Sequence, residues 1–223
     1  MAHVASSEFD TASGWASERA ERRVADVNGD GRADIIGFGY GQTYVSLGQA
    51  NGTFLGTISA TGDYDIESGW GSEGYEREVA DVNGDGHADI IGFGYGATYV
   101  SLGTSNGTFE TGFVATNQFS EVHGGWSAED LERRVFDVNN DGRADIVGFG
   151  HAETYIALGQ SDGTFSTAEV ATQEFVSAAG WGHEGYERRI GDVNGDGIAD
   201  IIGFGHSDTY VSLGTTADEF ILV

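Results

Sequence analysis

Four short loops of alternating oxygen-bearing side chains are the part of this sequence that could do chemistry. The first loop places Asp26, Asn28, Asp30 and Asp34 at its positions one, three, five and nine, with glycine at position six. Hard oxygen ligands that wrap around one point suit Ca²⁺, and a glycine at position six allows the sharp bend of a calcium-binding loop. We therefore predict a structural Ca²⁺ ion in each loop, although the bidentate glutamate at position twelve of the complete pattern is missing.

The same loop occurs three more times along the chain. The predicted metal ligands of these copies are Asp81, Asn83, Asp85 and Asp89; Asp137, Asn139, Asp141 and Asp145; and Asp192, Asn194, Asp196 and Asp200. The alternative is a metal-free loop closed by Asx turns, because Asp and Asn side chains also bind nearby backbone amides. In both interpretations the loop fastens the structure and implies no catalysis.

The elements that must position these loops recur with them, at spacings of 55, 56 and 55 residues. In the first repeat two short apolar runs, 22–27 and 34–39, flank the loop, and an alternating run at 43–48 and an outer run at 53–65 follow. Four strands per repeat, without helical periodicity, are typical of a β-propeller blade. We therefore predict an all-β propeller with four antiparallel four-stranded blades; a β-solenoid is the alternative, although its coils are usually shorter.

The repeats predict a single propeller domain over residues 1–223. Its repeats lie at about 10–64, 65–119, 120–175 and 176–223, and residues 1–9 complete the last blade, because the run VASSEF near the N-terminus copies VATNQF and VATQEF. One blade is then divided between the two termini, and joining them closes a ring without an open sheet edge. The same complementarity could instead join two chains head to tail into one eight-bladed ring.

The repeated run DVNGDGxADIIGFG resembles the FG-GAP/VCBS-type repeat of integrin-like propellers. With Gly-Trp about eleven residues upstream, an arginine four residues before the first aspartate, and TYVSLG and NGTF downstream, the longer pattern is similar to propeller lectins of the Psathyrella velutina lectin and Photorhabdus lectin type. The resemblance covers all four repeats. It implies a sugar-binding propeller with pockets between blades and structural calcium loops, although those relatives usually have more than four blades.

A repeated segment upstream of each loop carries the groups that a sugar site needs. A sugar ring presents C–H groups to an aromatic face and hydroxyls to a few convergent polar groups. The predicted sugar-binding residues are Trp15, Glu18 and Arg22; Trp70, Glu73 and Arg77; Trp126, Glu129 and Arg133; and Trp181, Glu184 and Arg188. The alternative is that the tryptophans belong to the core between blades and that the arginines pair with a blade glutamate such as Glu21. Four residues after the GFG runs could line the rim of a pocket: Tyr40, Tyr95, His151 and His206.

Composition excludes several classes of partner. The formal net charge is -26, whereas nucleic-acid binding requires a basic surface. No run approaches 18 apolar residues, so we expect a soluble protein without membrane insertion. Cysteine is absent and the N-terminal segment lacks the features of a signal peptide, so the sequence does not decide between extracellular and cytoplasmic locations.

Repetition also separates the candidate functions. Every candidate acid occurs in each repeat, whereas a glycoside hydrolase needs one asymmetric pair of carboxylates. We therefore predict no enzyme but a multivalent lectin, or agglutinin, that binds glycans or glycoconjugates and holds Ca²⁺ as a structural cofactor. The alternative is a non-catalytic protein-interaction or adhesion scaffold of FG-GAP type.

Overall fold

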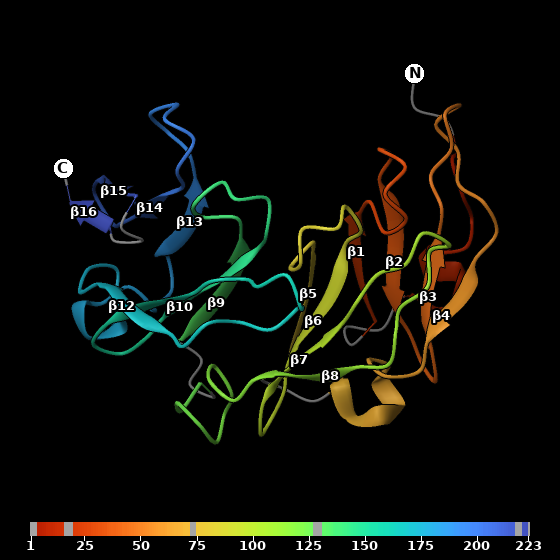
Figure 1. The fold of residues 1–223 in the computed structure, drawn as a ribbon, viewed down its shortest axis with the longest axis horizontal. Coiled ribbons are helices and arrows are strands. Elements are labelled where there is room, and N and C mark those ends of the chain that lie inside the picture. Colours follow the sequence, from red (N-terminus) through yellow and green to blue (C-terminus); the bar gives the residue numbers. More distant parts are fainter. Residues whose placement is uncertain (1–3, 16–19, 72–74, 127–130, 217–219, 223) are drawn as a thin grey trace. The chain divides into compact units, whose positions relative to one another are not determined.

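The computed structural model of the chain describes residues 4–15, 20–71, 75–126, 131–216 and 220–222. It contains four antiparallel sheets, and in each sheet the four strands are adjacent in chain order (Figure 1). The strands of the first sheet are β1 (Glu21–Ala25), β2 (Asp34–Phe38), β3 (Thr43–Ser46) and β4 (Ile58–Thr61). Those of the second sheet are β5 (Glu76–Ala80), β6 (Asp89–Phe93), β7 (Thr98–Ser101) and β8 (Phe113–Thr116).

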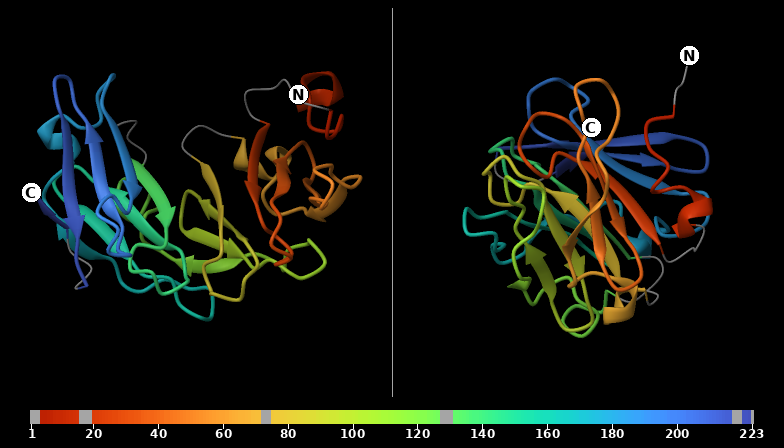
Figure 2. Two further views of the ribbon diagram at one scale, coloured as in Figure 1. Left: turned by 90° about the horizontal axis from the view of Figure 1, so that it is seen from above. Right: turned by 90° about the vertical axis from the view of Figure 1, so that its right-hand side faces the viewer.

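The third and fourth sheets repeat this order, and Figure 2 shows their strands from two further sides. The strands of the third sheet are β9 (Glu132–Phe136), β10 (Asp145–Phe149), β11 (Thr154–Ala157) and β12 (Glu169–Thr172). Those of the fourth sheet are β13 (Glu187–Gly191), β14 (Asp200–Phe204), β15 (Thr209–Gly214) and β16 (Phe220–Leu222). The predicted all-β fold with four-stranded repeats is therefore confirmed.

Three short helical turns precede the sheets: η1 (Thr11–Trp15), η2 (Ile66–Trp70) and η3 (Ser177–Ala179). The η2 turn begins at Asp65, whose carboxylate accepts hydrogen bonds from the backbone amides of Glu67 and Ser68 at 2.7 and 3.0 Å. This is the capping that an aspartate provides at the start of a helical turn. Two of the turns end at tryptophans, Trp15 and Trp70, which pack against the second strands β2 and β6.

The second strand of each repeat is apolar on both faces. In β2, Ile36 and Phe38 are fully buried, and Ile35 points to the other face and is partly buried. Successive side chains of a strand point to opposite faces, so a strand with neighbours on both sides reads as a continuous apolar run. The run DIIGF is therefore the sequence of a strand that lies between two packed layers.

The chain divides into two compact units. One comprises Met1–Asp81, Asp85–Gly94 and Thr98–Val114, and the other Val82–Gly84, Tyr95–Ala97 and Ala115–Val223. Each unit has its own core in which one sheet packs against the next. In the first unit, Val27, Ile36 and Phe38 lie in one cluster with Tyr64 and Ile90. In the second unit the corresponding cluster contains Val138, Val147, Phe149, Phe175, Ala199 and Ile201. This is the packing of consecutive blades; closure of a ring, the single domain and the repeat boundaries stay predictions.

The fourth sheet ends differently from the other three. In those three repeats an isolated bridge, such as Gly48 with Phe54, precedes the outer strand. In the fourth sheet the equivalent pair, Gly214 and Phe220, opens the pairing of β15 with β16. The counterpart of the outer strand is the N-terminal run, and residues 4–9 form no strand in the described chain. That this run completes the last blade therefore stays a prediction.

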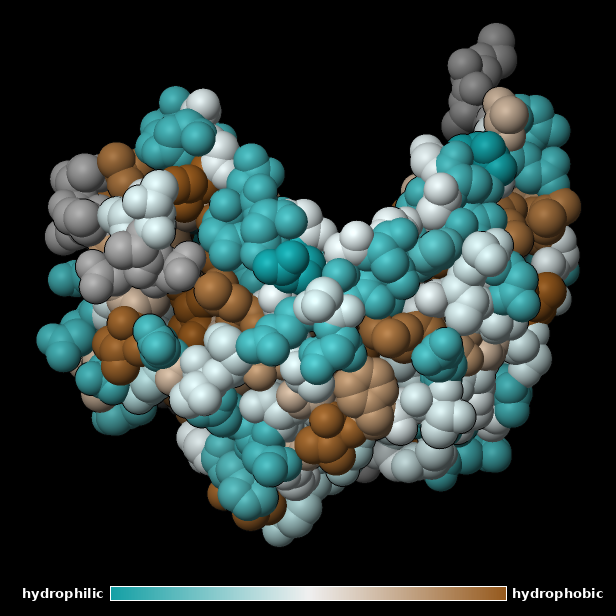
Figure 3. All heavy atoms as spheres, viewed as in Figure 1, coloured by the Kyte–Doolittle hydropathy of each residue, from teal (hydrophilic) through white to brown (hydrophobic). Residues whose placement is uncertain are grey.

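The surface agrees with the composition. Hydrophilic side chains cover much of the face shown in Figure 3. Within the described residues, no helix has both the length and the hydropathy required to cross a bilayer.

Candidate functional site

The first Asp-rich loop is organised by its own backbone amides. The carboxylate of Asp26 accepts hydrogen bonds from the amides of Asp30 and Gly31 at 3.1 and 2.7 Å. The carboxylate of Asp30 accepts from the amide of Arg32 at 3.0 Å and also pairs with the Arg32 guanidinium. The side-chain oxygen of Asn28 accepts from the Asp30 amide at 3.2 Å. These are Asx-type turns, and the positive charge beside the fifth position comes from arginine.

The other loops differ at the seventh position, which follows the glycine at position six. In the third loop Arg143 pairs with Asp141 as Arg32 pairs with Asp30. In the second loop the His87 ring nitrogen Nδ1 lies 3.0 Å from an Asp85 oxygen. In the fourth loop this position is Ile198. Hydrogen bonds from the amides of Gly197 and then Gly195 lower the pKa of the exposed Asp192 there.

The ninth aspartate of each loop has a different role from the first three ligand positions. Its buried carboxylate bridges two strands: the Asp34 oxygens accept from the Val27 and Gly48 amides at 2.9 and 2.8 Å. Asp145 makes the same pair of bonds, at 2.9 and 2.8 Å, to Val138 and Gly159. Burial raises the pKa of the Asp145 carboxyl to about 7, against the lowering by these two amides. Asp200 makes the same pair of bonds to the Val193 and Gly214 amides, and Asp89 accepts from the Gly103 amide at 2.7 Å. This aspartate fastens the end of the first strand to the end of the third.

The loop geometry is not that of a preformed metal site. Among the residues that the structure describes, no group of three or more His, Cys, Asp or Glu side chains converges so that it could hold a metal ion. The ninth aspartates Asp34, Asp145 and Asp200 have both oxygens on backbone amides, whereas the first, third and fifth positions keep side-chain oxygens near the surface. Calcium binding stays a prediction, and it would require Arg32 and Arg143 to leave their aspartates.

Each predicted tryptophan sets the edge of its six-membered ring against a glycine of the second strand. A Cβ atom on Gly37 would overlap the rings of Trp15 and Phe9, so this position needs a glycine. Trp15 is 9% exposed, and its ring centre lies 5.0 Å from that of Phe9 and 6.3 Å from that of Tyr44. The equivalent glycine–tryptophan pairs are Gly92 with Trp70, Gly148 with Trp126 and Gly203 with Trp181. The second strand therefore fixes the position of each tryptophan ring.

The predicted arginines make contacts inside the fold. Each donates a hydrogen bond from Nη1 to the carbonyl of the aromatic residue that packs on the tryptophan: Arg22 to Phe9 at 2.7 Å, Arg77 to Tyr64 at 3.1 Å, Arg133 to Phe119 at 3.0 Å and Arg188 to Phe175 at 3.0 Å. Three of them are buried, and Arg22 is exposed. Arg77 also pairs with Glu21 at 3.0 Å, and Arg188 with Glu132 at 2.9 Å. This geometry favours the structural alternative for the arginines; sugar contact by them stays an untested prediction.

The predicted glutamates can be placed in one repeat. Glu184 is exposed and lines none of the pockets described below. Glu18, Glu73 and Glu129 lie outside the described residues.

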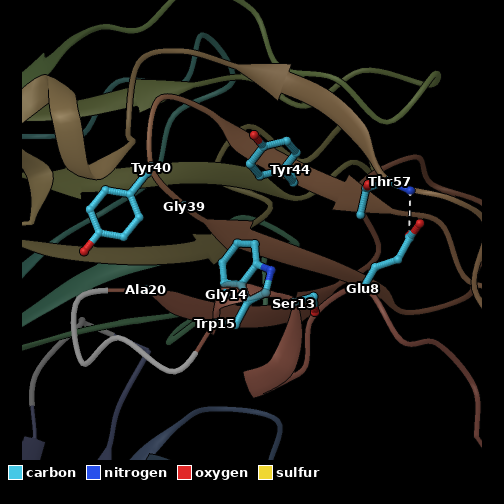
Figure 4. A pocket seen from close by; sticks show the side chains of 9 residues that line it. All are labelled: Glu8, Ser13, Gly14, Trp15, Ala20, Gly39, Tyr40, Tyr44 and Thr57. Atoms are coloured by element: carbon cyan, nitrogen blue, oxygen red, sulfur yellow. Dashed lines mark hydrogen bonds between the residues drawn. The ribbon is translucent and has the colours of Figure 1, made fainter.

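Three equivalent pockets contain three of the four tryptophans, Trp15, Trp126 and Trp181, and none of the predicted arginines. The first has a volume of about 330 Å³ and is lined by Trp15, Tyr40, Tyr44, Glu8 and Thr57, among others. Figure 4 shows the Trp15 and Tyr44 rings near its centre, Tyr40 on one side, and Glu8 with Thr57 on the other. The Glu8 carboxylate accepts a hydrogen bond from the Thr57 amide at 2.8 Å. The pocket therefore combines aromatic surface with a carboxylate fixed by the backbone.

The two pockets of the second unit repeat this plan. One, of about 550 Å³, is lined by Trp126, Tyr155, His151, His123 and Gln118, among others. The other, of about 490 Å³, is lined by Trp181, Tyr210, His206, Tyr186 and Glu174, among others. The Gln118 carbonyl oxygen accepts from the Ala168 amide at 2.8 Å, as Glu8 does from Thr57. Each pocket thus has one tryptophan, one tyrosine of the third strand, and the equivalent acid or amide, Glu8, Gln118 or Glu174; the last pocket also has Asp208.

The sequence interpretation missed two parts of these pockets. The tyrosines Tyr44, Tyr155 and Tyr210 are the second residues of the TYVSLG-like runs, and their alternation with buried valine or isoleucine was the available signal. The polar residues Glu8, Gln118 and Glu174 stand directly before the phenylalanine of the VASSEF-like runs. The predicted rim residues Tyr40, His151 and His206 line these pockets.

The chain is an all-β repeat protein, in which repeated four-stranded sheets carry equivalent pockets. The chain belongs to the FG-GAP-like repeat family, whose model matches residues 26–92, 81–147 and 137–203. This confirms the FG-GAP resemblance. No curated protein matches the chain.

Two solved structures share the fold. An Agrocybe aegerita lectin that recognises non-reducing terminal N-acetylglucosamine is similar with a TM-score of 0.83 and 39% identity, over 89% of this chain and 50% of that chain. This chain therefore spans about half the length of that lectin. A Photorhabdus luminescens Tc holotoxin pore matches over 93% of this chain and 9% of its own, with a TM-score of 0.66 and 16% identity, which shows the fold alone.

Proposed function

We propose that this chain is a carbohydrate-binding protein, a lectin, whose binding sites are the repeated tryptophan–tyrosine pockets. The observation that carries the proposal is the recurrence of one pocket in three repeats of a chain that is 39% identical to a lectin for terminal N-acetylglucosamine. We propose a non-reducing terminal sugar of that class as the ligand.

The composition of the pockets supports this proposal. The C–H face of a sugar ring stacks on aromatic surface, and in the first pocket Tyr44 and Tyr40 offer more exposed ring than the buried Trp15. The carboxylate of Glu8 accepts hydrogen bonds, as an acid that binds sugar hydroxyls must. Its bond to the Thr57 amide fixes one oxygen, so that the second can receive a ligand without losing conformational entropy.

Repeated sites raise the apparent affinity for a surface that carries many glycans. A single shallow pocket gains little beyond the entropy lost on binding, so each site binds a monosaccharide weakly. Several sites on one chain raise the apparent affinity for a glycan-coated surface by roughly 10²–10⁴. The role of the chain is then multivalent attachment without catalysis. Its place in the FG-GAP-like family keeps a non-catalytic protein-interaction scaffold as the second candidate.

A glycan array tests this function. We expect the chain to bind probes with a terminal N-acetylglucosamine and to leave galactose-terminated probes empty. The triple variant Tyr44→Ala, Tyr155→Ala and Tyr210→Ala should lose binding, whereas Phe136→Ala should keep it, because Phe136 is exposed and lines none of the three pockets. An array without any bound glycan would refute the lectin and leave the scaffold.

A further inference from the structure

The junction between consecutive sheets has a fixed composition, seen first in the first unit. The guanidinium carbon of Arg77, on the second sheet, lies 4.9 Å from the ring centre of Phe38, on the first. Arg77 also pairs with Glu21 of the first sheet at 3.0 Å. Both Arg77 and Phe38 are buried, at 1% and 0% exposure. One sheet therefore offers a phenylalanine and a glutamate, and the next covers them with an arginine.

The second unit contains the same junction. Arg188 of the fourth sheet lies 4.8 Å above the Phe149 ring of the third and pairs with Glu132 at 2.9 Å. We call the side of a sheet that carries the phenylalanine its trailing face, and the side that carries the arginine its leading face. A trailing face that is not covered by a leading face would expose a large apolar group.

The trailing face of the fourth sheet is exposed. Phe204 is 44% exposed and Val193 is 53% exposed. The equivalent phenylalanines, Phe38, Phe93 and Phe149, are all 0% exposed, and the equivalent valines Val27, Val82 and Val138 are 0%, 0% and 3% exposed. Glu187, the counterpart of Glu21, pairs with Arg189 of its own strand and has a side chain that is 61% exposed. This face therefore has the composition of a junction that lacks its partner.

The leading face of the first sheet is the matching half. Arg22 is exposed, Ile35 is partly exposed and Ala33 is exposed. Their counterparts are buried in the other repeats: Arg77, Arg133 and Arg188; Ile90, Ile146 and Ile201; and Ala88, Ala144 and Ala199. In the described part of the chain the Arg22 guanidinium binds the Phe9 carbonyl, and no carboxylate pairs with it. Arg22 and Glu187 have opposite charges. Their positions in the repeat are those of the Arg77–Glu21 and Arg188–Glu132 pairs.

The edge of β15 and the N-terminal run at residues 4–9 are a second complementary pair. The β15–β16 pairing covers Ser212, Leu213 and Gly214 of β15. In the first sheet, by contrast, β4 covers the start of β3, where Tyr44 pairs with Ser59. The start of β15 has no such partner among the described residues, and the run that copies the missing strand lies at residues 4–9. An open edge of this kind pairs readily with an added strand.

We propose that the trailing face of the fourth sheet binds the leading face of the first sheet of a second copy of this chain. Arg22 of one copy covers Phe204 of the other and pairs with its Glu187, and the N-terminal run of the first copy extends β15 of the second. The contact is head to tail, so two copies close on each other through two identical junctions. This assembly needs no sugar and stands independently of the lectin proposal.

The solution mass of the 223-residue chain tests this inference. Analytical ultracentrifugation should give twice the 23.5 kDa of one chain at micromolar concentration. Arg22→Glu and Phe204→Glu should each weaken the association at least ~100-fold, because the first sets a carboxylate against Glu187 and the second removes the apolar ring that Arg22 covers and puts a second acid beside Glu187. Arg22→Glu combined with Glu187→Arg should restore the double mass, because both junctions regain an opposite pair. Leu55→Glu is the matched control, since Leu55 is 49% exposed and its counterpart in the second repeat is Glu110.

Circular dichroism and melting curves of the same variants show that the sheets remain folded. Rescue by the reversed pair supports the proposal and cannot come from loss of folding. A mass of one chain, or of more than two, overturns it. So does a double mass that Arg22→Glu and Phe204→Glu leave unchanged, because the copies would then meet through another surface.

Discussion

The guanidinium carbon of Arg188 lies 4.8 Å from the centre of the Phe149 ring, and each group belongs to a different sheet. Arg188 is 4% exposed and also binds the Phe175 carbonyl and the Glu132 carboxylate. One arginine therefore joins three segments of the second unit. This explains its recurrence as a structural requirement of the junction between blades.

Removal of this arginine should cost stability. Arg188→Ala leaves the Phe175 carbonyl without its buried donor, while Glu132 keeps its pair with Arg134, and should lower the free energy of unfolding by about 1–3 kcal/mol. Arg189→Ala, on the same strand, is the matched control, because its side chain is 52% exposed and its pair with Glu187 lies at the surface; its cost should be under about 1 kcal/mol. Urea unfolding of both variants measures the difference. Equal midpoints would contradict the structural role of Arg188.

The glycine under each tryptophan offers a second test. Gly148→Ala places a methyl group against the rings of Trp126 and Phe119 and should destabilise the fold by about 1–3 kcal/mol through overpacking. Gly191→Ala is the control: a Cβ there meets no atom within 4 Å, and the equivalent residues are Ala25 and Ala80. Thermal melting compares them. If Gly148→Ala melted at or above the wild-type temperature, the tight contact would be refuted.

The ninth aspartate of the loop should matter more than an exposed acid. Asp145→Ala leaves the Val138 and Gly159 amides without their acceptor, and each buried unsatisfied donor costs about 1–3 kcal/mol. Glu169→Ala, an exposed acid on β12, should be close to neutral. The free energies of unfolding of the two variants, measured by chemical unfolding, should differ by about 2–6 kcal/mol, because the Asp145 change affects both amides. A neutral Asp145→Ala would show that the carboxylate does not fasten the strands.

Calcium binding, if the loops have it, should follow the residue beside the fifth position. The fourth loop carries Ile198 there and has no cation to displace, whereas Arg32 and Arg143 occupy their aspartates. The fourth loop should therefore bind first, and Arg32→Ala should strengthen binding at the first loop. Binding to the folded state stabilises it by about 2.7 kcal/mol at a hundredfold excess over Kd.

Calorimetric titration of metal-free protein with Ca²⁺ measures this. Melting curves with EDTA and with added Ca²⁺ provide the control. No heat of binding together with identical melting curves would remove calcium from the account and leave the Asx turns as the reason for the repeated loop.

The repeated sequence motifs predicted the sheets, because apolar and alternating patterns depend on the local geometry of a strand. DIIGF predicted a buried strand, since apolar residues on both faces need neighbours on both sides, and Ile36 and Phe38 are fully buried. The positions of the strands follow from the same alternation. The sequence does not distinguish the loop-closing role of Asp26 from the strand-bridging role of Asp34, because both are aspartates of one loop. Only the structure shows that Asp34 opens β2 and turns its carboxylate inward.

The candidate site could be predicted in part for the same reason. Tryptophan in each repeat indicated aromatic surface, and Trp15, Trp126 and Trp181 do line pockets. The partner tyrosines belong to a third strand about 29 residues later, and only packing brings Tyr44 to Trp15. An arginine four residues before the loop has no sequence signal that separates a sugar contact from a buried ion pair.

The indole N–H signals of the four tryptophans test the central claim, that the repeated pockets bind sugar, most directly. In a proton–nitrogen correlation spectrum, titration with an N-acetylglucosamine-terminated oligosaccharide should shift the indole signals of Trp15, Trp126 and Trp181 in a saturable way. The arginine Nε–H signals of Arg77 and Arg188 should stay in place, and a galactose-terminated oligosaccharide should move neither set. Unmoved indole signals at saturating sugar would contradict the pocket assignment, and shifts confined to the arginines would place the ligand at the junctions instead.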